Sequence, residues 1–136
     1  MLDDVRQRCN AIEECYEFML AYAAQGLPGD ASNQSGGQLR HFLKRAVDAL
    51  SGLADSYAAA AKEGGLGSPA SYQAFLKVLD RDAGDSLAAL DLVLAQSSIS
   101  SQLIDNLNAS IHLRALLTDL FLIDEIIKPQ QVVATN

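Results

Sequence analysis

Apolar residues recur every three or four positions along most of the chain, which is the period of an α-helix with one buried face. Clusters of glycine, proline and serine separate four such segments. No segment alternates with the period of two that marks a half-buried strand. The pattern therefore predicts four helices, over residues 3–25, 38–62, 69–96 and 99–128, followed by a tail at 129–136.

The glycine and proline positions predict one long loop, a weak point inside the third helix and the end of the last helix. Residues 26–37, GLPGDASNQSGG, hold nothing that could build a core, so we expect a loop of about a dozen residues. Gly84 lies inside the third segment and costs about 1 kcal/mol relative to alanine, so either the helix bends there or Asp85 caps a new helix. Of these we expect a continuous or kinked helix. Pro129 is expected to end the last helix.

Four amphipathic helices with one long loop, between the first two, predict an all-α four-helix bundle. The chain has 136 residues, which is enough for one domain with a core of its own. Hydrophobic residues make up 49% of the sequence, a fraction that excludes intrinsic disorder for most of it. No repeat or change of composition marks a boundary, so residues 1–136 are expected to form a single domain.

Residues 111–127, IHLRALLTDLFLIDEII, form the most apolar part of the last segment, with eleven apolar residues of seventeen. On a helical wheel these residues fall on two sides, so this helix cannot be a surface helix with one buried face. The smaller side holds Ile111, Ala115, Leu122 and Ile126. The larger side, which we expect to contact a partner chain in a homodimer, holds Leu113, Leu116, Leu117, Leu120, Ile123 and Ile127.

A stripe of polar residues runs between those two apolar sides, formed by Asp105, Asn108, His112 and Asp119. An unpartnered polar group in apolar surroundings costs about 1–3 kcal/mol, so these side chains must be paired or hydrated. Three arrangements satisfy them. The stripe is a buried network inside the bundle, part of an interface between two chains, or the lining of a groove for a ligand or water.

The charge of the chain excludes several functions. The net charge is -7 and the pI is near 4.6, which argues against nucleic-acid binding because phosphate contacts need a basic surface.

No run approaches the roughly 18 apolar residues of a membrane span, and the first residues, MLDDVRQR, have no apolar signal-peptide core. Cys9 and Cys15 point in different directions on one helix, so they cannot form a disulfide with each other there. Two reduced thiols fit a reducing compartment. We therefore expect a cytoplasmic protein.

The junction before the second helix is a candidate anion site. A helix that starts after glycines offers free backbone amides and the positive end of its dipole, and cations placed there oppose the dipole. A bound phosphate or carboxylate would remove that conflict, as would salt bridges to an acidic face formed by Glu13, Glu14 and Glu17 of the first helix. The candidate residues are Ser35, Gly36, Gly37, Arg40, His41 and Lys44.

The tetrapeptide His41-Phe42-Leu43-Lys44, on a helix of a small α-helical domain, resembles the phosphorylated helix of histidine phosphotransfer domains. That resemblance implies a phosphoacceptor role for His41. In the family the motif continues with a small residue, usually glycine, which lets a response regulator approach the imidazole. Arg45 stands at that position here.

Other chemistry finds little support. A ferritin-like metal site needs Glu-x-x-His on two helices, but Gln38 precedes His41 and Ala109 precedes His112, so we expect no metal and no cofactor. There is no GxSxG motif, and two histidines leave few bases, so we expect no enzyme. We expect an adaptor, assembly factor or regulator that binds itself and another protein. The alternatives are an anion-binding or phosphotransfer module and, more weakly, a metal-binding bundle.

Overall fold

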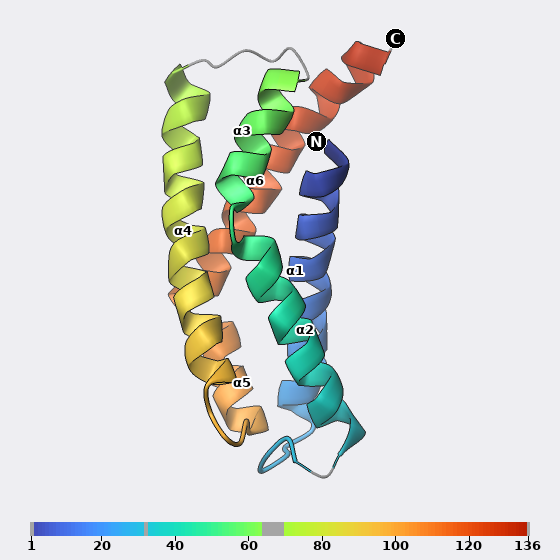
Figure 1. Cartoon of the computed structure of the whole chain (residues 1–136), viewed down its shortest axis with the longest axis vertical. Coiled ribbons are helices and arrows are strands. Elements are labelled where there is room, and N and C mark those ends of the chain that lie inside the picture. Colours follow the sequence, from blue (N-terminus) through green and yellow to red (C-terminus); the bar gives the residue numbers. More distant parts are fainter. Residues whose placement is uncertain (1, 32, 64–69, 136) are drawn as a thin grey trace.

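The computed structural model describes residues 2–31, 33–63 and 70–135, with the side chains of residues 2, 63 and 127–135 outside that description. The described residues form six helices and no strand, which confirms the all-α prediction but not the count of four (Figure 1). The helices are α1 (Leu2–Ala24), α2 (Gln34–Leu50), α3 (Leu53–Glu63), α4 (Ala70–Leu94), α5 (Ser101–Ala109) and α6 (Ile111–Thr135).

The helices run up and down beside one another. In Figure 1, α3 continues above α2, and α6 rises from α5 behind α4 toward the N-terminus of α1. Helix α1 packs against α2, α3 and α5, while α4 packs against α2, α3 and α6. The α1–α2 and α4–α5 connections lie together at the lower end of the molecule in this view.

Two of the predicted helices are each divided in two. The second breaks at Ser51 and Gly52, where Ser51 is extended and Gly52 takes φ 80°, a left-handed conformation that glycine adopts without strain. The last breaks at Ser110, which is extended with φ -65° and ψ 143°. The backbone N–H of Ser110 donates to the carbonyl of Leu107 at 3.1 Å, which closes the last turn of α5. Serine favours such ends because its hydroxyl competes with helical hydrogen bonding.

The α1–α2 loop is shorter than predicted, because α2 begins at Gln34 instead of residue 38. Asn33 caps the helix, and its side chain accepts a hydrogen bond from the backbone N–H of Gly36 at 2.5 Å. The two glycines therefore lie in the first turn of α2. Gly36 is required there by a close approach, since a Cβ on it would lie 1.9 Å from the carbonyl oxygen of Asp30.

Neither Gly84 nor Pro129 interrupts a described helix. Helix α4 runs through Gly84 without interruption, as expected of a continuous helix. The prediction that Pro129 ends the last helix is wrong, because α6 continues to Thr135. Proline at this position removes one backbone N–H, the donor that would bond the carbonyl of Glu125, and the helix goes on without it.

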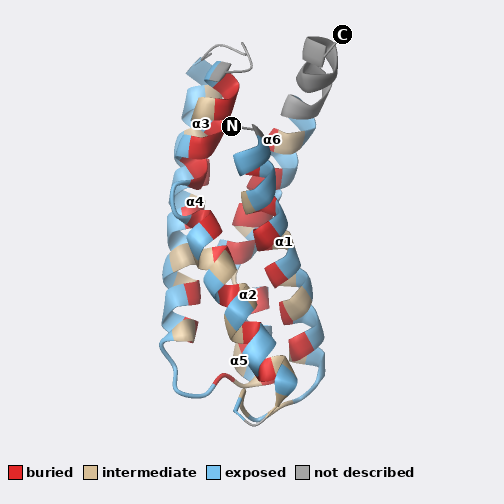
Figure 2. Ribbon diagram, turned by 45° about the vertical axis from the view of Figure 1, so that its right-hand side comes forward, coloured by how far each residue is buried: buried red, intermediate tan, exposed pale blue. Residues whose placement is uncertain are grey.

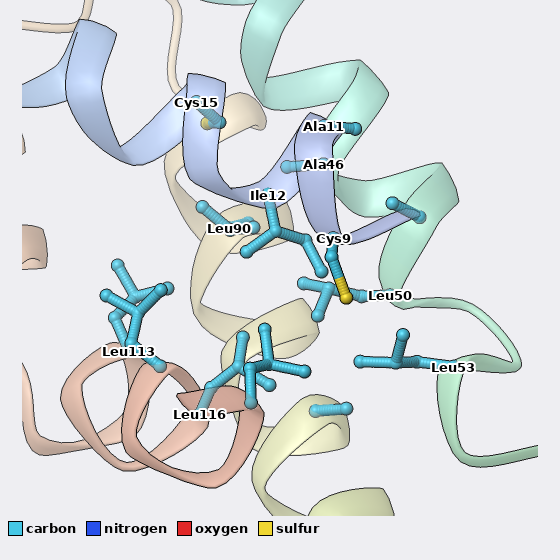
Figure 3. Close-up of a cluster of buried hydrophobic side chains, with 14 of the residues drawn as sticks. Cys9, Ala11, Ile12, Cys15, Ala46, Leu50, Leu53, Leu90, Leu113 and Leu116 are labelled. Atoms are coloured by element: carbon cyan, nitrogen blue, oxygen red, sulfur yellow. The ribbon is translucent and has the colours of Figure 1, made fainter. Parts of the chain in front are cut away.

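Buried side chains line the inner faces of the helices (Figure 2). Figure 3 shows Ile12 of α1 surrounded by Leu50, Leu90, Leu113 and Leu116, which come from α2, α4 and α6. A void of about 10 Å³ lies in this cluster, enough for about one water molecule. Its lining is apolar, so this part of the core is packed for stability and has no room for a ligand.

None of the described helices is long and apolar enough to cross a membrane.

Candidate functional site

The outward side of α6 exposes apolar side chains. Of the seven large apolar side chains exposed in the described residues, four are on α6: Ile111 (75%), Phe121 (60%), Ile126 (57%) and Leu122 (51%). On the helical wheel, residues 111, 115, 122 and 126 fall within about 60° of one another. We call Ile111, Ala115, Leu122 and Ile126 the outer α6 face. It is the smaller of the two apolar sides identified in the sequence.

The larger apolar side does not contact a partner in this conformation. Five of its six residues are buried in the core of the chain itself, and the side chain of Ile127 lies outside the described residues. The wider side turns inward because it removes more apolar area from water than the narrower one. The residues assigned to an interface are therefore corrected. Those that form the core are Leu113, Leu116, Leu117, Leu120 and Ile123.

The polar stripe is divided between core and surface. Asp105 and His112 are exposed, whereas Asn108 and Asp119 are buried within the chain. Neither polar atom of the Asn108 side chain has a hydrogen-bond partner among the described residues. The four residues therefore do not form one continuous network.

Asp119 faces α4, where it pairs with Asp82. Only 6% of Asp119 is exposed. Burial, followed by the hydrogen bond to Asp82 and the charge of that residue, raises the pKa of Asp119 to about 7. Two carboxyl groups this close repel each other when both are ionised, which favours the protonated form of Asp119. This pair connects α4 to α6 at a short distance from the outer α6 face.

A second polar group ties three helices together. The Cys9 thiol lies 3.2 Å from the Tyr57 hydroxyl, which donates a hydrogen bond of 2.7 Å to Asp124 Oδ1. Burial raises the pKa of Cys9 to about 11 and that of Cys15 to about 12. Both thiols are free and stay protonated at neutral pH, so neither is an effective nucleophile. The contact joins residues that are far apart in the sequence, so it can be found only from the packing of α1, α3 and α6.

The candidate anion junction is used for contacts within the chain. The Arg40 guanidinium bonds Asp30 Oδ2 at 2.5 Å and the carbonyl oxygens of Leu94 and Gln96 at 3.2 and 2.9 Å. The amide of Gly36 is already capped by Asn33. The geometry therefore argues against an anion site at this junction, because its guanidinium and one of its amides are satisfied by the protein.

The remaining candidates at this junction do not converge on a pocket with Arg40. His41 and Lys44 are exposed, Ser35 is half-buried and Gly37 is exposed. Arg45 forms a salt bridge of 2.9 Å with Glu14, one of the pairings expected with the acidic face of α1. The His41 ring meets the edge of the Phe42 ring, with centroids 6.0 Å apart.

Arg40 belongs to a network of hydrogen bonds that joins the α1–α2 and α4–α5 loops. We call this network the lock. Asp30 Oδ1 accepts a hydrogen bond from the backbone N–H of Ile99 at 2.6 Å, and the Tyr22 hydroxyl donates to the carbonyl of Ile99 at 2.7 Å. Ser101 Oγ donates to the carbonyl of Tyr22 at 2.6 Å. The hydrogen bonds from Arg40 and Ile99 hold the pKa of Asp30 below its ordinary value. These contacts stabilise the fold, so we assign the lock a structural role.

Metal ligands are not gathered in the described residues, where no three His, Cys, Asp or Glu side chains are arranged to hold an ion. No protein-family model, no characterised protein and no solved structure matches this chain.

Proposed function

We propose that this protein works as a protein-binding module, an adaptor, assembly factor or regulator, and that the outer α6 face is its contact surface. The observation that carries the proposal is the exposure of Ile111, Leu122 and Ile126 along one side of a single helix. Isolated apolar residues are normal on a surface, whereas a row of them on one face of a helix is typical of helix-mediated recognition.

The energetics favour this use. Full burial of an isoleucine or leucine side chain is worth about 1.5–3 kcal/mol. Since the three large side chains of the face are at least half exposed, covering them would contribute roughly 1–2 kcal/mol each. A neighbouring exposed residue, Phe121, adds aromatic area that is common at binding sites.

The rest of the molecule supports a scaffold role. We infer a four-helix bundle from the described helices, in which α2 with α3 and α5 with α6 each count as one helix. Their inner faces are filled, and the thiols are buried and protonated. Two free cysteines fit a reducing compartment, and we place the protein in the cytoplasm on that ground.

Photo-cross-linking in the cells that make the protein tests the proposal. Benzoylphenylalanine replaces Leu122 on the outer α6 face or, as a matched control, Leu20, an exposed apolar residue of α1. We expect position 122 to give a discrete adduct whose second chain is identified by mass spectrometry, and position 20 to give none. Equal adducts from both positions, or none from position 122, overturn the proposal.

A further inference from the structure

The spacing of the outer α6 face is the same read in either direction. Its residues stand at 111, 115, 122 and 126, with intervals of four, seven and four. The pairs 111 with 126 and 115 with 122 share one midpoint, between Thr118 and Asp119. A two-fold antiparallel pairing can use this property, because a contact of residue i with residue j of the second copy is matched by a contact of residue j with residue i.

We propose that the outer α6 face binds the same face of a second copy of this chain, with the two α6 helices antiparallel about a two-fold axis between Thr118 and Asp119. This inference rests on the proposed function and names its partner. Ile111 then packs against Ile126 of the second copy, and Ala115 against Leu122. The small side chain of Ala115 gives Leu122 of the second copy room to enter. The paired stretch is about 22 Å long at 1.5 Å per residue.

The charges beside the face suit the antiparallel orientation. When two helices pair antiparallel about such an axis, the same flank of each helix meets. Arg114 and Glu125 lie on one flank of the outer α6 face, about 20° apart on the wheel, and both are exposed. Arg114 of one copy therefore comes beside Glu125 of the other, and the symmetry makes this ion pair twice.

The opposite flank does not obstruct the pairing. Its acidic residue, Asp119, is turned toward Asp82 on α4 and is almost fully buried. The carboxyl group therefore lies beneath the contact. Since the face has four residues, against about 20–30 on each side of a standard interface, we expect a reversible dimer that depends on concentration.

Sedimentation velocity of the purified full chain over a wide concentration range tests the pairing. We expect a monomer–dimer equilibrium that the double substitution Leu122→Glu, Ile126→Glu shifts by at least tenfold toward monomer. Both positions are exposed, so the variant should keep the thermal midpoint of the parent protein. Leu20→Glu, which places one such charge on α1, should leave the equilibrium unchanged.

Charge reversal tests the antiparallel geometry itself. Arg114→Glu and Glu125→Arg should each weaken the dimer severalfold, because like charges then meet across the axis, and the two together should restore it. A cysteine near the axis, Thr118→Cys, should form a disulfide between copies on mild oxidation. Ile111→Cys should not, because its equivalents are then about 22 Å apart.

The results that would overturn this self-pairing differ from those that would overturn the proposed function. A monomer at every concentration overturns the self-pairing, and so does a dimer that the substitutions at 122 and 126 leave intact. If position 122 still cross-links to a different protein in cells, the module function stands and its partner is that protein. A dimer in which the double charge reversal fails to rescue overturns the antiparallel arrangement.

Discussion

Replacing Asp119 with asparagine should stabilise the protein, and the gain should grow with pH. Asparagine keeps the size of the side chain and can donate a hydrogen bond to Asp82, but it has no charge to bury. In the folded protein the pKa of Asp119 is raised from 3.8 to about 7 by burial and by Asp82. The wild type therefore carries an ionisation cost at neutral pH that the variant lacks.

The sign and size follow from proton linkage. Below about pH 4, Asp119 is protonated in both states and contributes nothing. Between about pH 4 and pH 7 the unfolded chain loses this proton while the folded chain keeps it, so the free energy of unfolding falls by up to 1.36 kcal/mol per pH unit. Over roughly three units the loss approaches 4 kcal/mol, and it is complete above pH 7.

Urea unfolding followed by circular dichroism at several pH values measures this difference. At pH 8 we expect Asp119→Asn to be more stable than the wild type by about 2–4 kcal/mol, and at pH 5 by no more than about half of that. Asp105→Asn removes the same charge from an exposed position of α5 and should change stability by less than about 0.5 kcal/mol at every pH. A variant whose gain is equal at pH 5 and pH 8, or negative at pH 8, would refute the reasoning.

Two further substitutions test the lower end of the molecule. Asp30→Ala deprives one guanidinium and one backbone N–H of their acceptor, so the free energy of unfolding should fall by about 2–4 kcal/mol, whereas Asp3→Ala, which breaks an exposed ion pair, should cost less than about 0.5 kcal/mol. Equal losses in thermal or urea unfolding would contradict the lock. Gly36→Ala should lower the thermal midpoint markedly, because its Cβ meets backbone at 1.9 Å, while Gly37→Ala, with open space around it, should raise the midpoint slightly. A similar midpoint for the two alanine variants would show that the close approach is absent.

Periodicity predicted where helices exist, but it did not predict where they break. The helical pattern continues across Ser51 and Gly52, because the buried residues Leu50, Leu53 and Tyr57 keep the spacing of three and four. Across Ser110 the buried face changes side, since the buried residues of α5 and those of α6 lie on nearly opposite sides of one helical wheel. A single glycine costs only about 1 kcal/mol within a helix, which the packing of a long helix can exceed. Gly84 and Gly52 therefore look alike in sequence, yet the first lies in a continuous α4 and the second takes a left-handed turn.

The anion hypothesis stays a prediction, but the structure shows that one of the groups it relies on is already engaged. Glycines and cations around a helix start predict a ligand only if nothing in the chain itself takes those groups. Here a loop residue ten positions upstream of Arg40, together with two carbonyls more than fifty positions downstream, occupies the guanidinium. Contacts at such separations depend on the packing of α4 beside α2, which local sequence does not specify.

The two sides of α6 show how the candidate contact depends on the rest of the fold. Both sides carry isoleucine and leucine with the helical period, but the larger side holds six such residues and the smaller three, so apolar area favours the larger side as the core. Packing against α4 and the other helices decides it, because the wider side buries more area and the narrower side is left outside. The symmetric spacing of Ile111, Ala115, Leu122 and Ile126 bears on assembly only because this side of α6 is the exposed one. A palindromic row that faces the core carries no information about assembly, whereas the same row on the surface is compatible with the two-fold pairing that we propose.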